Sequence, residues 1–193
     1  MMKHLTFLEE GKFSQREEKV IAIAGYLETL ESSPLKSATD FVHELRRSTA
    51  EKDKIYRKRT ASEVLDSGFT TGCTDVGLAF VVLTRELGIP TRFVDTFYEP
   101  WIKNLSKSKD GKIYGHVFAD VFIDGEWKCY DPAKGFTPNN EYILPGRGKY
   151  IEIGKGLDFS EIFIKNPKTG KRDTKPTNLG SFKDLEGVIK LFK

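Results

Sequence analysis

Three residues along the chain have side chains that together could carry out thiol chemistry. Cys73 lies in the segment 70–75, at the start of an apolar run with helical spacing. His116 opens a strand-like segment downstream, and Asp131 closes the next one. A thiol, an imidazole and a carboxylate in these positions match the nucleophile, base and orienting acid of a cysteine-dependent acyl-transfer site. We therefore expect an enzyme that works through these three residues.

The position of Cys73 favours a reactive thiolate over an inert thiol. A side chain in the first turn of a helix lies near the positive end of the helix dipole and near backbone N–H groups that lack helical partners. Both features stabilise a thiolate, and the same N–H groups can donate to an oxyanion. Gly72, the preceding residue, lets substrate and backbone approach closely. The alternative is a small buried cysteine, but the downstream His116 and Asp131 favour the nucleophile.

A predicted hairpin provides a test of the histidine–aspartate pair that depends only on register. Asp124 and Gly125 are a strong signal for a two-residue turn between strands. The expected opposed pairs are Phe122 with Trp127, Asp120 with Cys129 and Phe118 with Asp131. Because His116 lies two residues before Phe118, it becomes a diagonal neighbour of Asp131, about 7 Å away between backbones. A shift of one residue would put the two side chains on opposite faces.

Several segments around these residues resemble the core of the transglutaminase-like superfamily. The matching segments are 61–65, 72–75, 85–92, 116–122, 124–127 and 131–132, in the family's order. The resemblance implies an α+β, papain-like fold. In that fold, N-terminal helices and the nucleophile helix bearing Cys73 pack on an antiparallel β-sheet bearing His116 and Asp131. It also implies that Cys73 is the nucleophile, His116 the general base and then acid, and Asp131 the residue that holds the imidazole tautomer.

The whole chain, residues 1–193, is expected to form one domain around a core at about 60–135. A helical part at 13–59 precedes the core and an extension at 136–193 follows it. Capping-box pairs predict three helix starts, at Ser14 with Glu17, Ser37 with Asp40 and Thr60 with Glu63. The basic connector 52–59 is expected to be a solvated linker. From 74 to 87 apolar residues cover nearly every side, which predicts a buried helix that stops at Gly88.

Strand-like patterns follow this helix. They predict strands at 91–98, 114–123 and 126–131, and an edge strand at 149–153. The polar, lysine-rich segment 99–112 is expected to be a surface loop beside the site. We expect an exposed basic loop at 165–175 and a last amphipathic helix at 182–192.

Composition narrows the class of protein. The 193 residues include 31 basic and 28 acidic side chains, so a net charge of +3 names no polyanionic partner. No apolar stretch approaches a membrane span, and the N-terminal residues lack the apolar core of a signal peptide. We therefore expect a cytoplasmic protein without a membrane partner. Two cysteines are too few for a disulfide framework. The sequence leaves the oligomeric state open.

Other residues near the site have weaker claims. Candidates for substrate binding are Gly72, Trp101, Tyr114 and Phe118; family members often have tryptophan at the position of Phe118. Asp75 is expected to stabilise the helix start, as acids in a first turn do. A zinc site of Cys73, His116, Cys129 and Asp131 is an alternative, but the chain has no close ligand pair such as Cys-x-x-Cys. We therefore expect no metal and no other cofactor.

The expected reaction is acyl transfer or hydrolysis at an amide through a thioester on Cys73, as in a cysteine peptidase or amidase. The substrate would be a peptide, a protein or a small amide. A protein-glutamine or other amine-accepting acyltransferase is the close alternative, because it shares the thioester. The alternative from another class is a non-catalytic module that binds nucleic acid through the basic loop 165–175. That loop has no interleaved aromatic residues, which argues against a nucleic-acid partner.

Overall fold

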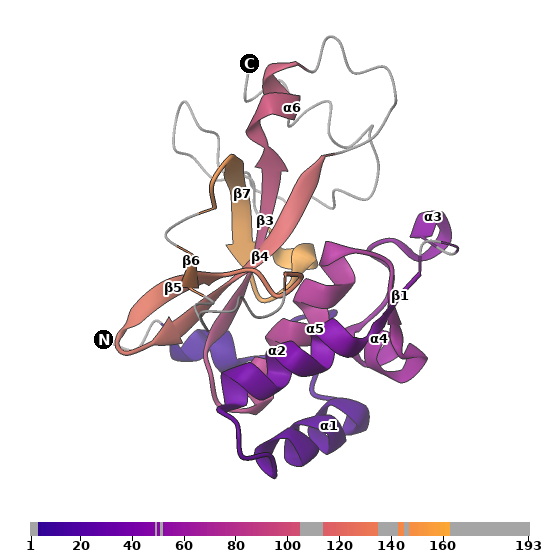
Figure 1. Cartoon of the computed structure of the whole chain (residues 1–193), viewed down its shortest axis with the longest axis vertical. Helices are drawn as coiled ribbons and strands as arrows, with labels where there is room; N and C mark the ends of the chain where they lie inside the picture. Colours follow the sequence, from indigo (N-terminus) through magenta and orange to yellow (C-terminus); the bar gives the residue numbers. More distant parts are fainter. Residues whose placement is uncertain are drawn as a thin grey trace.

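The computed structural model describes residues 4–48, 50, 52–104, 114–134, 143–144 and 147–162. Its helices are α1 (Glu18–Glu28), α2 (Pro34–Glu44), α3 (Lys52–Ile55), α4 (Ala61–Ser67), α5 (Cys73–Glu86) and α6 (Glu99–Lys103), with 3-10 turns η1 (Leu5–Leu8) and η3 (Phe159–Glu161). Its strands are β1 (Arg46–Arg47), β2 (Phe69–Thr70), β3 (Thr91–Tyr98), β4 (Gly115–Ile123), β5 (Glu126–Tyr130), β6 (Ile143–Leu144) and β7 (Tyr150–Gly156). Helices α1, α2, α4 and α5 gather on one side of the main sheet, and α6 follows the far end of β3 (Figure 1). The fold is the α+β architecture that the sequence predicts.

The main sheet has five strands in the order β6-β5-β4-β3-β7, and each neighbouring pair is antiparallel. The predicted edge strand is β7, which among the described strands pairs only with β3. A separate parallel pair joins β1 to β2, just before α5. The sheet thus brings β7 beside β3, although the two strands are far apart in the sequence.

The hairpin of β4 and β5 has the predicted register. Phe122 lies opposite Trp127 and Asp120 opposite Cys129. Pairing with β5 ends where Ala119 meets Tyr130, so the start of β4 is not paired with β5.

The turn of this hairpin also has the predicted geometry. Asp124 and Gly125 have φ angles of 55° and 82°. Positive values at both central residues are what a type I′ turn requires, and this turn matches the twist of the flanking strands. The turn therefore sets the register that places His116 near Asp131.

Helix α5 is central to the core because it is apolar on nearly every side. All of its residues from Thr74 to Arg85 are buried. A Cβ on Gly77 would lie only 2.4 Å from Val117 Cγ1, so glycine is what lets the helix approach β4 so closely. The helix stops before Gly88, which has a φ of 78°. This packing fixes the height of the first turn of α5 above the sheet.

Alternate residues of β4 face opposite sides of the sheet. Val117, Ala119 and Val121 belong to the hydrophobic core that contains α5. His116 and Phe118 therefore lie on the other face. The start of β4 pairs with β3 but not with β5, and there His116 interacts with Cys73, the first residue of α5.

Of the predicted capping boxes, the one of α4 is present and the one of α2 is not. Helix α4 begins with the expected box, in which Thr60 and Glu63 each accept a hydrogen bond from the other's backbone N–H. Helix α2 begins at Pro34 rather than near Ser37, because Ser33 accepts a hydrogen bond from a backbone N–H of the first turn. Proline at the first helical position adds to that earlier start.

The predicted capping box of α1 is wrong. The helix begins at Glu18 without a side-chain cap. Ser14 instead accepts a hydrogen bond from the Gly11 N–H at 3.1 Å and donates to the Leu157 carbonyl at 3.4 Å. A long-range contact with the end of the described chain has therefore replaced the local cap.

The basic connector 52–59 is not a solvated linker. Its first residues form α3, and Arg57 and Arg59 are buried, at 5% and 9% exposure. Each guanidinium has a buried carboxylate partner, Asp95 for Arg57 and Asp75 for Arg59. Because a buried charge is stable only when paired, these two long-range partners explain why the connector lies inside.

The expected surface loop at 99–112 begins instead with α6. Trp101 and Ile102 in this short helix are each 7% exposed. Residues 105–113 lie outside the described part of the chain, as do the predicted basic loop at 165–175 and the predicted helix at 182–192. Among the described helices, none has the length and apolar character to cross a membrane.

Candidate active site

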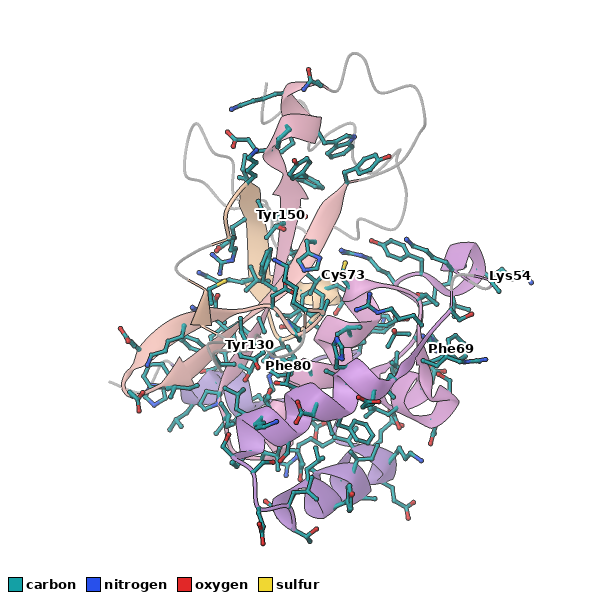
Figure 2. The ribbon with its side chains drawn as sticks, viewed as in Figure 1. Lys54, Phe69, Cys73, Phe80, Tyr130 and Tyr150 are labelled. Atoms are coloured by element: carbon teal, nitrogen blue, oxygen red, sulfur yellow. The ribbon has the colours of Figure 1, made fainter. Side chains whose placement is uncertain are left out.

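Cys73 is the first residue of α5, at the end of the helix that points toward the sheet (Figure 2). Gly72 precedes it with an extended backbone and provides no side-chain cap. The backbone N–H groups of the first turn therefore have no partner within the helix. A Cβ added to Gly72 would meet no atom within 4 Å, so the space beside it is open. Backbone donors of the first turn can reach a group bound in that space.

His116 and Asp131 are joined by a hydrogen bond, as the hairpin register leads one to expect. His116 Nε2 lies 2.8 Å from Asp131 Oδ1. The two side chains are 18% and 2% exposed, so this bond is largely shielded from water. A carboxylate offers only acceptors, so Nε2 carries the proton and Nδ1 is left for another partner.

The thiol of Cys73 is the second partner of this imidazole. Burial opposes a charge on His116, but hydrogen bonds to Asp131 and to Cys73, together with the charges of those two groups, outweigh burial. Together, these effects raise the pKa of His116 to about 9. The imidazole is therefore protonated at neutral pH, and an imidazolium beside a thiol stabilises the thiolate.

Asp131 is held in place by its own neighbours. The Ala133 N–H donates to Oδ1 at 3.1 Å, and Lys134 Nζ lies 3.6 Å from Oδ2. Oδ2 is buried and has no hydrogen-bond partner among the described residues. The bonded oxygen is thus the one that faces His116, and the carboxylate is oriented by the turn that follows β5.

Phe118 lies where the sequence placed it, beside the histidine. It is 2% exposed, and its ring centre is 4.8 Å from that of His116 in an edge-on arrangement. Because Phe118 is buried, it packs against the imidazole and has little surface that a substrate could contact.

Tyr150 is the residue near the site that sequence reasoning missed. Its ring centre lies 5.6 Å from His116 and 5.5 Å from Phe118. Figure 2 shows it on the sheet, close to the end of α5 that carries Cys73. Burial, the neighbouring Tyr98 and the charges of Asp131 and Cys73 raise the pKa of Tyr150. Its hydroxyl is therefore neutral at neutral pH and can donate a hydrogen bond.

Trp101 and Tyr114 form a separate aromatic contact. The Trp101 ring lies 5.5 Å from Phe97 and 6.3 Å from Tyr114, and it is buried in the packing of α6 on β3. Tyr114, one residue before β4, is 45% exposed. These ring contacts of Trp101 are with residues other than the three proposed catalytic ones. A role in substrate binding for this pair remains a prediction.

The described part of the chain shows no arrangement of side chains suited to a metal ion. No group of three or more His, Cys, Asp and Glu side chains there is placed to hold a metal ion, which speaks against the zinc alternative. Cys129 lies on the hairpin opposite Asp120. Burial raises the pKa of the Cys129 thiol, so this second cysteine is the less reactive type.

Comparison with known families agrees with this geometry. The family model described as the transglutaminase-like superfamily matches residues 14–132, well over half of the chain. This chain belongs to the transglutaminase-like superfamily. The match begins among the N-terminal helices, so the superfamily domain includes α1 and α2 as well as the residues around the site.

One solved structure has a similar fold. It is a crystal structure described as that of "a putative cysteine protease" from Cytophaga hutchinsonii, with a TM-score of 0.57 and 14% sequence identity. The similarity covers 82% of this transglutaminase-like chain and 48% of the other chain. This chain thus spans about half the length of that protein. No curated protein is significantly similar to this chain in sequence.

Proposed function

We propose that this chain is a thiol-dependent enzyme that hydrolyses an amide bond, as a cysteine peptidase or amidase does. One observation carries the proposal: His116 is hydrogen-bonded at 2.8 Å to Asp131 while Cys73, at the start of a buried helix, interacts with the same imidazole. A core histidine with only a structural role does not need a thiol on one side and a buried carboxylate on the other. Membership of the transglutaminase-like superfamily supports the same class of chemistry.

The reaction would begin from a thiolate and an imidazolium. The Cys73 sulfur attacks the amide carbonyl carbon, and N–H groups of the first turn of α5 donate to the oxyanion. His116 gives its proton to the amide nitrogen as the C–N bond breaks, which releases an amine and leaves a thioester on Cys73. Asp131 holds Nε2–H throughout, so it is Nδ1 that faces the reacting atoms.

Water would complete the cycle. Neutral His116 takes a proton from water as the oxygen attacks the thioester carbonyl, and the acid product leaves as the thiolate and the imidazolium form again. An amine could take the place of water at this step and give a new amide. Hydrolysis is the default outcome, because transfer needs a site that binds the amine and excludes water.

Profiling with peptide and small-amide libraries would test this proposal. We expect turnover by the wild-type chain, none by Cys73→Ala, and unchanged turnover by Cys129→Ala, the matched control for loss of a thiol. Mass spectrometry of the enzyme stopped during turnover should find the acyl group on Cys73. Turnover by Cys73→Ala equal to that of the wild type would overturn the proposal.

A further inference from the structure

A single carboxylate holds the turn that leads into α5. Asp75 lies in the first turn of the helix and is 3% exposed. Its Oδ2 accepts the backbone N–H and the hydroxyl of Thr71, each at 2.8 Å. Because Thr71 and Gly72 directly precede Cys73, these two bonds fix the path by which the chain enters the helix. Asp75 is therefore tied to the backbone beside the thiol, and does more than stabilise a helix end.

A buried arginine holds this carboxylate in turn. Arg59 Nη2 donates to Asp75 Oδ2 at 2.5 Å. The same guanidinium donates to the Phe69 carbonyl at 3.1 Å and to the Ser67 hydroxyl at 2.8 Å, and it lies 4.6 Å from the centre of the Phe69 ring. Arg59 is thus fastened to the end of α4 and to β2. Through Asp75, that anchor extends to Thr71.

The pair also sets the charge close to the thiol. Among the described residues, the titratable and charged groups around Cys73 include His116 on β4, Asp131 and Lys134 after β5, Tyr150 on β7, Asp75 on α5 and Arg59 before α4. The Asp75 carboxylate is bonded to the backbone of Thr71, two residues before Cys73, so its charge alone would oppose a thiolate there. The Arg59 guanidinium offsets that charge. An acid can therefore order the turn without working against the nucleophile.

We propose that Arg59 and Asp75 are positioning residues that order the backbone at Cys73 while keeping the local charge neutral, so that the thiolate is not opposed. This inference rests on the proposed function of Cys73 as a nucleophile. It assigns a role to the connector 52–59, which the sequence alone describes only as basic. Both side chains are buried and contact the protein, so they act through the backbone before Cys73.

Opposite changes of charge make the test specific. The readout is the pH midpoint of the alkylation rate of Cys73 by iodoacetamide, measured by peptide mass spectrometry, which needs no substrate. Arg59→Met leaves a lone negative charge, and its midpoint should rise by about one pH unit. Asp75→Asn leaves a lone positive charge and keeps an acceptor for Thr71, and its midpoint should fall by a similar amount. The double variant should return close to the wild-type midpoint.

A merely structural pair would behave differently. If Arg59 and Asp75 only stabilised the fold, both single variants would move the midpoint in the same direction or leave it unchanged, and either result would overturn the inference. Asp75→Asn changes the shape of the side chain little. An unchanged midpoint in this variant alone would overturn the inference, even if circular dichroism shows that Arg59→Met does not fold. Arg16→Met is the matched control, because Arg16 pairs with Glu86 at the other end of α5 and should leave the midpoint unchanged.

The same experiment separates the two proposals. A wild-type Cys73 that alkylates no more readily than an ordinary thiol would contradict the proposed function itself. A reactive wild-type Cys73 whose midpoint ignores both substitutions would contradict only the role of Arg59 and Asp75.

Discussion

Replacing Asp131 with asparagine turns the charged acceptor of the His116 hydrogen bond into a neutral one and nearly preserves the side chain's shape. In the native chain, against the opposing effect of burial, the hydrogen bonds and charges of Asp131 and Cys73 raise the pKa of His116 from 6.5 to about 9. One pKa unit corresponds to about 1.4 kcal/mol, so the surroundings favour the imidazolium by about 3 kcal/mol. The hydrogen bond to Asp131 is the largest contribution that raises this pKa. We expect Asp131→Asn to lower the pKa of His116 by about one unit or more.

Nuclear magnetic resonance of labelled histidine would measure this change directly. The chain has three histidines, and a His116→Gln spectrum would assign the signal of interest. We expect a pKa for His116 near 9 in the wild type and a clearly lower pKa in Asp131→Asn. An ordinary pKa near 6.5 in the wild type, or the same pKa in both proteins, would refute the reasoning.

The same shift predicts how stability depends on pH. Because the pKa of His116 is raised on folding, the imidazolium stabilises the folded chain fully below about pH 6.5, and this stabilisation is lost as the pH rises through about 9. Denaturant titrations at pH 6 and pH 9.5 should therefore show a loss of up to about 3 kcal/mol from this group in the wild type. The loss should be smaller in Asp131→Asn. Its turnover should also fall, by about 10³-fold or more, because the wrong imidazole tautomer becomes accessible.

Further expectations concern neighbouring residues and the second half of the reaction. His116→Ala should abolish turnover of any substrate that needs Cys73, with circular dichroism as the check on folding; near-wild-type turnover would show that another base acts. Tyr150→Phe should lower kcat about tenfold or more if its hydroxyl stabilises the oxyanion, whereas equal rates for Tyr150→Phe and the control Tyr98→Phe would exclude that role. Gly77→Ala, whose Cβ would come 2.4 Å from Val117 Cγ1, should lower the free energy of unfolding by about 1–3 kcal/mol in a denaturant titration, and an unchanged value would mean that α5 can shift freely. Turnover with rising primary amine should still give mostly free acid; amide product dominating at millimolar amine would favour an acyltransferase over the proposed hydrolase.

Local patterns allowed the core of the fold to be predicted. The turn at Asp124 and Gly125 determines the register of β4 and β5, and that register determines which residues lie beside His116. The all-round apolar pattern of α5 is equally local, and so is the glycine that follows it. The relation between His116 and Asp131 could therefore be expected from counting residues along one hairpin.

Other features depend on contacts between distant segments, which no local pattern records. Tyr150 reaches the site because β7 pairs with β3, about fifty residues earlier in the chain, so only the sheet order reveals it. Arg59 belongs to a basic, polar segment, yet it is buried because it pairs with Asp75. That partner is sixteen residues further along the chain. Ser14 failed as a helix cap for the same reason, since it bonds to Leu157.

Competitive alkylation of the two cysteines tests the central claim most directly. The native chain would be treated with limiting iodoacetamide between about pH 5.5 and pH 9, and each cysteine peptide would be quantified by mass spectrometry. Because Cys73 lies at a helix start beside an imidazolium and Cys129 is a half-buried thiol with a raised pKa, we predict that Cys73 is labelled first at mildly acidic pH. Equal labelling of the two, or labelling of Cys73 only above about pH 8, would contradict a catalytic thiolate at this position.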